Sequence, residues 1–250
     1  ALVNDGITIV ISPLIALMKD QVNRLKSLGI NAEAIYSGMR PAEIDRLLDN
    51  ARFGKTKLLY VSPERLKTDM FRARVQTMPV RLIAVDEAHC ISQWGHDFRP
   101  SYLEVGDLRA ALPGVPVLAL TASATKAVQD EIVEKLHLKN PVIVRDSYAR
   151  HNLHYHVIPR EDQLSYMERL LLKSPGSAIV YVRHRRKCVE LAQWFSTKGM
   201  NAVAYHGGMD MKTRDVVQAD WISGAARVIV ATNAFGMGVD KSDVRLVVHA

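Results

Sequence analysis

Two adjacent carboxylates and a histidine, Asp86, Glu87 and His89, follow an apolar run over residues 81–85. Such a run is typical of a buried strand, and open parallel α/β sheets bind their ligands at the carboxyl ends of the strands. In nucleotide hydrolases one carboxylate at this position holds Mg²⁺, and a neighbouring group orients the attacking water. Asp86 and Glu87 are candidates for these two roles, although a strand ending in a solvated acidic turn would carry the same pair.

Strands and helices alternate along the whole chain. Apolar and often β-branched runs predict strands at residues 7–11, 32–35, 57–61, 81–85, 117–120, 142–145, 178–182, 202–205, 228–231 and 246–249. Apolar residues at helical spacing separate most of these runs, which indicates βαβ units and parallel sheets. The pattern starts again after a boundary segment at residues 148–160. We therefore expect an α/β protein with two domains in tandem, residues 1–147 and 148–250.

Composition narrows the class of protein. The 250 residues carry a net charge of +7, and residues 148–250 supply five of those charges, which favours a polyanionic partner. The two cysteines, Cys90 and Cys188, belong to no paired metal motif, so we expect a reducing compartment and no structural zinc. No apolar run approaches the roughly 20 residues of a membrane span, and no secretory signal is present. We expect a cytoplasmic protein, in the bacterial cytoplasm or nucleoid, that does not bind membranes.

The sequence lacks one part that a nucleotide-binding α/β domain usually has. Such a domain carries a glycine-rich phosphate loop, ending in Gly-Lys-Ser/Thr, directly after its first strand. The run Gly54-Lys55-Thr56 has no upstream glycine at the required spacing, and it lies between a predicted helix and a strand. We expect either that the chain binds nucleotide in another way or that it begins just beyond such a loop.

The segment that follows the carboxylates is the most specific signal in the chain. Residues 86–100, which start Asp-Glu-Ala-His and continue through Trp94 and Phe98, resemble motif II and the aromatic-rich loop of the RecQ family of superfamily 2 DNA helicases. Matches to that family's motifs Ia, Ib, III and V occur in the same order at residues 12–21, 62–65, 119–122, 204–208 and 230–241. The resemblance implies two tandem RecA-like domains of the P-loop NTPase type with mostly parallel sheets, both incomplete at the chain ends.

The resemblance also implies roles for the residues around the acidic pair. Asp86 would hold Mg²⁺, Glu87 would polarise water against the γ-phosphate of ATP, and His89 and Gln93 would sense the nucleotide state.

Three residues just beyond the acids, Trp94, Phe98 and Arg99, form an apolar and cationic group suited to stacking on a base or to packing against the second domain. The alternative is that Trp94 and Phe98 simply fill a core, although a turn rich in Gly, His, Asp and Pro is unlike a core segment.

Further polar residues lie at or after predicted strand ends, where they would meet DNA. The implied DNA-binding and coupling residues are Ser12, Lys19, Ser62, Arg65, Thr121, Thr125 and Thr232. Ordinary helix capping by Ser12, Ser62, Thr121 and Thr125 is the alternative. In the second domain, Gly236 and Asp240 would approach the nucleotide; the alternative, a plain glycine-rich turn, is disfavoured by the rest of the match. The role of the basic run at residues 183–187, which departs from the family's motif IV, stays open.

The implied function is an ATP-dependent DNA helicase. It would move 3′ to 5′ on single-stranded DNA by hydrolysing Mg-ATP, bind single strands and duplex junctions as a monomer, and act in DNA repair and recombination. Because the 250 residues contain neither the phosphate-loop lysine nor the family's arginine finger, we expect them to be inactive in isolation. A non-catalytic nucleic-acid-binding module on a degenerate helicase core is the alternative. An RNA helicase of a related group is disfavoured by the aromatic-rich loop.

Overall fold

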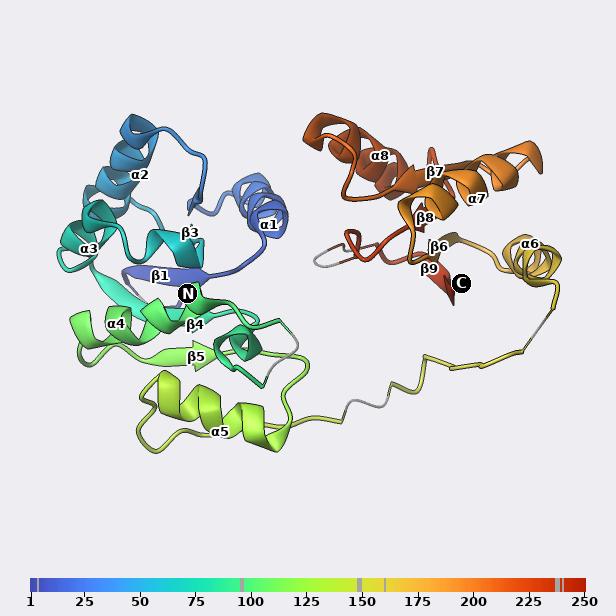
Figure 1. Cartoon of the computed structure of the whole chain (residues 1–250). Helices are drawn as coiled ribbons and strands as arrows, with labels where there is room; N and C mark the ends of the chain where they lie inside the picture. The colour runs from blue at the N-terminus through green and yellow to red at the C-terminus, as the bar shows by residue number, and fades with distance from the viewer. Residues whose placement is uncertain (4, 95–96, 148–149, 160, 237–238, 240) are drawn as a thin grey trace. The chain divides into compact units, whose positions relative to one another are not determined.

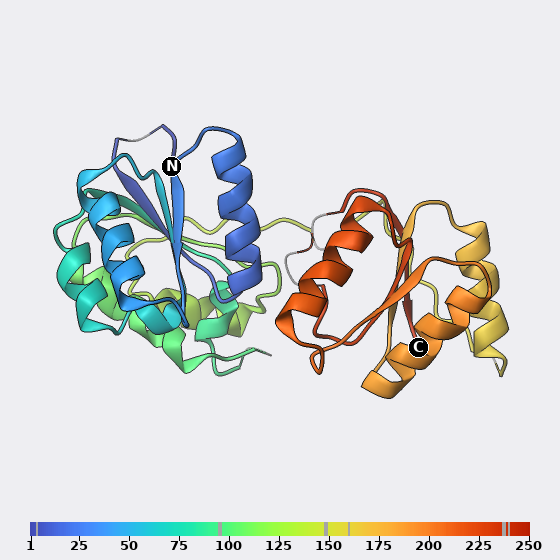
Figure 2. The same cartoon turned by 90° about the horizontal axis from the view of Figure 1, so that it is seen from above.

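The computed structural model describes all residues except 4, 95–96, 148–149, 160, 237–238 and 240. Its contacts divide the chain into two compact units, Ala1–Asp146 and Ser147–Ala250 (Figure 1). Figure 2 shows helices on both sides of the sheet in each unit. Within the described part of the chain, no helix is long and apolar enough to cross a bilayer.

The first unit is built on a five-stranded sheet. Its strands are β1 (Ile7–Ile11), β2 (Ala32–Ile35), β3 (Leu58–Val61), β4 (Val80–Val85) and β5 (Val117–Ala119). They lie in the order β2-β3-β1-β4-β5, and every pair of neighbours is parallel. All five carboxyl ends therefore point to the same edge of the sheet.

Helices cover both faces of this sheet. The α-helices are α1 (Ile15–Ser27), α2 (Pro41–Phe53), α3 (Asp69–Val75), α4 (Glu104–Ala111) and α5 (Lys126–Lys135), and the 3₁₀ helices are η1 (Pro63–Arg65), η2 (Ala88–Ile91) and η3 (Pro100–Leu103). Alternate strand residues point to opposite faces. Ile9 and Ile11 therefore pack in the core under α2 to α5, whereas Val10 packs against the residues of α1.

The second unit repeats this plan with four strands. They are β6 (Ser177–Tyr181), β7 (Ala202–Tyr205), β8 (Val228–Ala231) and β9 (Val244–His249), in the order β7-β8-β6-β9 and all parallel. The helices α6 (Gln163–Lys173) and α7 (Arg185–Thr197) pack on one face, and α8 (Met211–Ser223) packs on the other through the buried Trp221.

The structure confirms nine of the predicted strands and corrects one. The strand predicted at residues 142–145 is wrong, because these residues pair with no strand, and Val142 and Val144 are 91% and 88% exposed. An apolar run needs a neighbouring strand for its backbone hydrogen bonds, and the sheet already ends at β5. The helix α4 was not predicted, since its eight residues carry little helical periodicity.

Candidate active site

The polar residues that follow the strands of the first unit meet at the carboxyl edge of its sheet. Because β1 lies beside β4, Ser12 and Asp86 become neighbours although 74 residues separate them, and the Ser12 hydroxyl donates a hydrogen bond to Asp86 Oδ2 at 3.2 Å. Ser12 is fully buried, and α1 begins after Leu14 without a side-chain cap. The capping role for Ser12 is therefore wrong.

Asp86 is held from three directions. The Asp86 amide donates to the carbonyl of Ile11 at 2.9 Å, and Asp86 Oδ1 accepts from the Glu87 amide at 3.0 Å. The hydroxyl of the buried Tyr102 donates to the backbone carbonyl of Asp86 at 2.9 Å. Burial raises the pKa of Tyr102, which keeps the phenol protonated as a donor. The carboxylate and the adjoining Ser12 hydroxyl offer hard oxygen ligands in a fixed position, which fits the ligand preference of Mg²⁺.

Glu87 occupies a backbone conformation that side chains rarely adopt. Its φ and ψ are 48° and 44°, in the left-handed region, which costs about 1–2 kcal/mol for a residue other than glycine. This turn directs the chain from β4 into η2 and brings Glu87 Oε2 to 3.2 Å from His89 Nδ1. The Glu87 side chain remains 34% exposed, so its carboxylate can still reach water.

His89 connects this acidic turn to the segment that follows β5. The ring is buried, and its Nδ1 lies 3.0 Å from the Thr121 hydroxyl as well as 3.2 Å from Glu87. The amide of Ala88 donates to the carbonyl of Leu120 at 2.9 Å, which fixes the two segments side by side. The contacts thus run without a break from Ser12 to Thr121.

The aromatic-rich loop presents one large side chain to solvent. Trp94 is 81% exposed, so it is not a core filler, whereas Phe98 is half-buried. The amide of Trp94 donates to the hydroxyl of the fully buried Ser92 at 3.1 Å, and that hydroxyl donates to Glu131 on α5. Gln93 is exposed, and among the hydrogen bonds of the described residues none joins it to the acidic pair.

Arg99 connects the aromatic-rich loop to the segment that follows β1. Its guanidinium donates to the carbonyl of Pro13 at 3.1 Å through Nη1 and lies 3.4 Å from Asp97 through Nη2. Arg99, which was predicted to contact DNA, thus uses two of its guanidinium nitrogens for contacts within the first unit.

Two of the predicted DNA-contacting cations converge on Tyr36, which follows β2 at the same edge. Arg65 Nε donates to the Tyr36 carbonyl at 3.1 Å, and Lys19 Nζ lies 4.9 Å from the centre of its ring. Both Lys19 and Tyr36 also line a hollow of about 580 Å³ between α1, β2 and α2. Tyr36 was not predicted; its position directly after a strand is the signal that could have found it.

The two remaining residues of this group differ in their partners. Ser62 precedes η1 without a side-chain cap, and its buried hydroxyl has no hydrogen-bond partner among the described residues. Thr125 caps α5, because its hydroxyl accepts from the Val128 amide at 3.4 Å. The capping alternative is therefore wrong for Ser62 and confirmed for Thr125.

In the second unit, Thr232 and Gly236 follow β8. Thr232 is buried, and its hydroxyl accepts from the Ala234 amide at 3.5 Å. Gly236 has φ +125°, and a Cβ there would overlap the Tyr181 hydroxyl, so the turn requires glycine. The predicted Asp240 lies outside the described residues.

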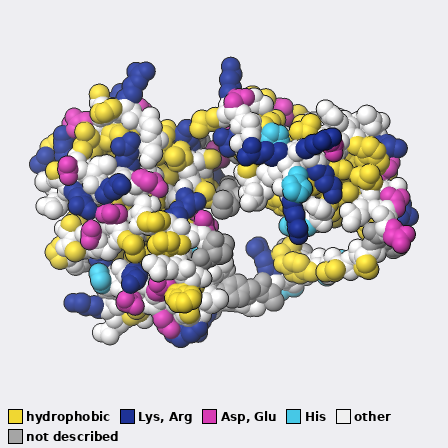
Figure 3. Space-filling model, viewed as in Figure 1, with side chains coloured by type: hydrophobic (Ala, Val, Ile, Leu, Met, Phe, Trp, Pro, Cys, Tyr) yellow, Lys and Arg dark blue, Asp and Glu magenta, His cyan; other side chains and the backbone are white. Residues whose placement is uncertain are grey.

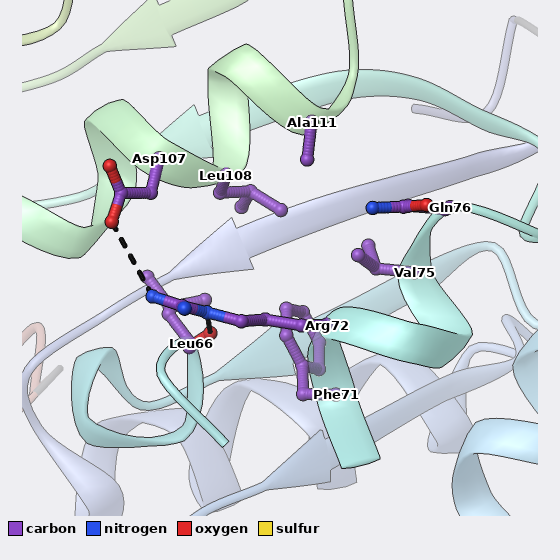
Figure 4. Close-up of a pocket in the computed structure, with 8 residues that line it drawn as sticks. All are labelled: Leu66, Phe71, Arg72, Val75, Gln76, Asp107, Leu108 and Ala111. Carbon is purple, nitrogen blue, oxygen red and sulfur yellow. Dashed lines mark hydrogen bonds and ion pairs between the residues drawn. The ribbon is translucent and has the colours of Figure 1, made fainter. Parts of the chain in front are cut away.

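The charged side chains are distributed differently over the two units. Figure 3 shows Lys and Arg interspersed with acidic side chains over the first unit, and Lys, Arg and His close together on the second. A pocket of about 190 Å³ lies between α3 and α4, where Arg72 pairs with Asp107 at 3.4 Å and the apolar Phe71 and Leu108 line the walls (Figure 4). None of its lining residues belongs to the predicted site.

Comparison with known families matches both units. Residues 2–131 match the model described as DEAD/DEAH box helicase, and residues 162–250 match the helicase conserved C-terminal domain.

Curated relatives align with the whole chain. It is 44% identical over 250 residues to the ATP-dependent DNA helicase RecQ of Haemophilus influenzae, covering 100% of this chain and 40% of that protein. It is 42% identical over 252 residues to the protein of the same name from Bacillus subtilis, covering 100% of this chain and 43% of the relative. The chain therefore spans about two-fifths of the length of these relatives.

Solved structures share the fold. The structure of the Mycobacterium smegmatis helicase Lhr bound to ssDNA and AMP-PNP gives a TM-score of 0.71 at 20% identity, covering 98% of this chain and 36% of that one. A DEAD box protein from Methanococcus jannaschii gives 0.55 at 19% identity, covering 98% and 66%. Both units are thus RecA-like α/β domains, as predicted. Since the DEAD/DEAH box model covers more than half of the chain and the RecQ relatives align with all of it, the chain belongs to the DEAD/DEAH box helicases and, among them, to the RecQ family.

Proposed function

We propose that the parent protein is an ATP-dependent DNA helicase that moves 3′ to 5′ on single-stranded DNA by hydrolysing Mg-ATP. The observation that carries this proposal is the unbroken series of contacts at the carboxyl edge of the first sheet, from Ser12 through Asp86, Glu87 and His89 to Thr121. The names of the RecQ relatives support ATP as the fuel and DNA as the substrate.

In this proposal the acidic residues divide the work of hydrolysis. Asp86, with the Ser12 hydroxyl beside it, would hold Mg²⁺, which supplies charge neutralisation to the phosphates when bound. Glu87 accepts a proton from the attacking water, for which its partly exposed carboxylate is suited. His89 orients that carboxylate through Nδ1 and joins it to Thr121, so a change at the phosphates alters the segment after β5.

DNA would bind along the same edge. The exposed Trp94 offers a face for a base, and stacking of this kind contributes about 1–3 kcal/mol per base. Lys19 and Arg65 lie where they could contact a phosphodiester, and Ser62 has a hydroxyl with no described partner. Arg99 connects the aromatic-rich loop to the segment after β1. Phe98 and Thr232 act in the same coupling, and Gln93 senses the nucleotide state.

In this proposal Gly236 and Asp240 of the second domain also contact the nucleotide. The position of Gly236 in the turn after β8, at the carboxyl edge of the second sheet, supports this contact. We further propose that the protein acts as a monomer in the cytoplasm, on single strands and duplex junctions, in DNA repair and recombination. The 250 residues contain no glycine-rich loop with Gly-Lys-Ser/Thr. On their own they should therefore hydrolyse ATP at least about 10³-fold more slowly than the parent protein.

The test compares substrates for the parent protein. We expect ATP hydrolysis that single-stranded DNA stimulates, and unwinding of a DNA duplex with a 3′ tail in preference to the matching RNA duplex. DNA binding without any stimulated hydrolysis would support the non-catalytic binding module instead, and preferential unwinding of RNA would support an RNA helicase.

A further inference from the structure

Three side chains with different metal-binding atoms face one another behind the acidic turn. They are His89, Cys90 and Asp97, and their ligand atoms all lie within 4.8 Å of one another. Cys90 Sγ is 3.9 Å from His89 Nε2 and 3.9 Å from Asp97 Oδ2. Imidazole, thiolate and carboxylate are the three ligand types that bind zinc in proteins.

The two separations at Cys90 are close to those between neighbouring ligands of a tetrahedral zinc site. With bonds of about 2.3 Å to sulfur and about 2.0–2.2 Å to nitrogen or oxygen, neighbouring ligand atoms in a tetrahedron are roughly 3.5 Å apart. The two distances of 3.9 Å at Cys90 need to shorten by a few tenths of an ångström. The third separation, between His89 and Asp97, is within 4.8 Å and must shorten by up to about 1.3 Å. Three protein ligands would leave a fourth position for water.

The hydrogen bonds of His89 provide a second, independent observation. Its Nε2 faces Cys90, whereas its Nδ1 lies 3.2 Å from Glu87 Oε2 and 3.0 Å from the Thr121 hydroxyl. Metal-binding histidines usually donate their other ring N–H to a carboxylate in this way, which fixes the ring and raises its basicity as a ligand. His89 is thus held as a metal ligand would be held.

The surroundings select the kind of ion. Burial and the nearby Asp97 raise the pKa of Cys90 to about 12, so an ion must displace the thiol proton in order to bind. A soft or borderline ion such as Zn²⁺ can do so, whereas Mg²⁺ prefers oxygen ligands. Cys90 and His89 are buried, but the Asp97 side chain is 41% exposed and offers an entry side. The ion pair of Asp97 with Arg99 would have to loosen.

We propose that His89, Cys90 and Asp97 form a binding site for a thiophilic divalent cation of the zinc class. The ion replaces the Cys90 thiol proton, which leaves to solvent, and no oxidation takes place. An ion at Nε2 holds His89 in the tautomer whose Nδ1–H donates to Glu87 and strengthens that hydrogen bond, so the carboxylate is less able to accept a proton from water. The site is therefore inhibitory, a consequence that rests on the proposed function; the binding itself does not.

The test is a titration of the 250-residue chain, without nucleotide, with Co²⁺ as a coloured substitute for Zn²⁺. We expect a thiolate-to-cobalt charge-transfer band and tetrahedral d–d bands, which one equivalent of Zn²⁺ abolishes. Cys90→Ser should remove the charge-transfer band. Cys188→Ser is the matched control, because Cys188 is equally buried but its Sγ donates to backbone carbonyls, at 2.9 and 3.6 Å, and belongs to no group of metal-binding side chains among the described residues. This variant should keep the band.

Asp97→Asn provides a second variant at a half-exposed position, where folding is not at risk, and should weaken Co²⁺ binding at least tenfold. Far-UV circular dichroism checks that every variant is folded. Absence of the band in the unmodified chain, its persistence in folded Cys90→Ser, or unchanged affinity in Asp97→Asn would each overturn the proposal. Because no nucleotide is present, such a failure would leave the proposed ATP hydrolysis untouched.

Discussion

The four strands of the second sheet have the same order as the first four strands of the first sheet, but the residues that follow equivalent strands differ in chemistry. In both units the first strand lies between the third and the fourth. The residue after the fourth strand donates its amide to the last carbonyl of the first strand at 2.9 Å: Asp86 to Ile11 in one unit, Ala250 to Tyr181 in the other. Where the first unit places Ser12 and Asp86, the second therefore places Val182 and Ala250.

The two units differ in the side chains at the carboxyl edge of the sheet, although the backbone arrangement at that edge is the same. In the first unit, side chains at the carboxyl edge bond to one another and include two carboxylates. In the second, the described side chains at this edge bond to backbone: the Tyr181 hydroxyl donates to the Phe235 carbonyl at 3.2 Å, and the ring of Tyr181 stacks on His249. The shared fold supplies the edge, and a few substitutions after the strands decide whether it carries chemistry.

Gly236→Ala tests the importance of shape in the second unit and has the largest expected effect on stability. The positive φ and the overlap with the Tyr181 hydroxyl together should lower the free energy of unfolding by about 2–4 kcal/mol. Urea denaturation followed by tryptophan fluorescence, to which the buried Trp221 contributes, measures this change. Gly224→Ala, which has positive φ but nothing within 4 Å, should cost only about 1 kcal/mol. Equal costs for the two variants would show that the Tyr181 contact does not matter.

Tyr102→Phe tests whether the first unit depends on its buried hydroxyl. Removing the donor to the Asp86 carbonyl should cost about 1–3 kcal/mol of unfolding free energy and weaken protection of the β4 amides from hydrogen exchange. Tyr155→Phe removes a hydroxyl from a side chain that is 87% exposed and should be neutral. Similar stability of both variants would contradict the account of how Asp86 is held.

Trp94→Ala tests the contact of the first unit with DNA. The affinity of the parent protein for single-stranded DNA should fall by about 1–3 kcal/mol, while its melting temperature stays the same because the side chain is exposed. Fluorescence anisotropy with a labelled oligonucleotide measures the affinity. Phe53→Ala, at another exposed aromatic residue, should leave the affinity unchanged. An unchanged affinity in Trp94→Ala would remove Trp94 from the interface.

Thr121 and Thr125 provide the finest comparison, between a site hydroxyl and a cap. Thr121→Ala should lower DNA-stimulated ATP hydrolysis of the parent by about three- to tenfold through loss of the His89 contact. Thr125→Ala should cost about 1 kcal/mol of stability and leave the hydrolysis rate nearly unchanged. If Thr125→Ala instead lowered hydrolysis and Thr121→Ala lowered only stability, Thr125 would be the site hydroxyl and Thr121 the cap.

The strands could be predicted because buried parallel strands are continuous apolar runs, and the location of the acidic pair follows from the end of one such run. The side chains that contact this pair and its neighbours could not be predicted from the sequence. Tyr102, Glu131 and Tyr36 reach the site through the packing of η3, α5 and β2, and nothing in the local sequence gives their distances. The same holds for residues 142–145, whose apolar pattern predicts a strand that finds no partner.

The most direct test of the central claim is the rate of ATP hydrolysis by Glu87→Gln in the parent protein, measured with saturating single-stranded DNA. The substitution keeps the size of the side chain but removes its negative charge and its ability to accept the proton from water. We predict a fall of about 10²–10⁴-fold with unchanged DNA affinity. Glu134→Gln, at an acid whose side chain is 71% exposed on α5, should behave like the unmodified protein. A rate in Glu87→Gln within a few-fold of the unmodified protein would contradict the account.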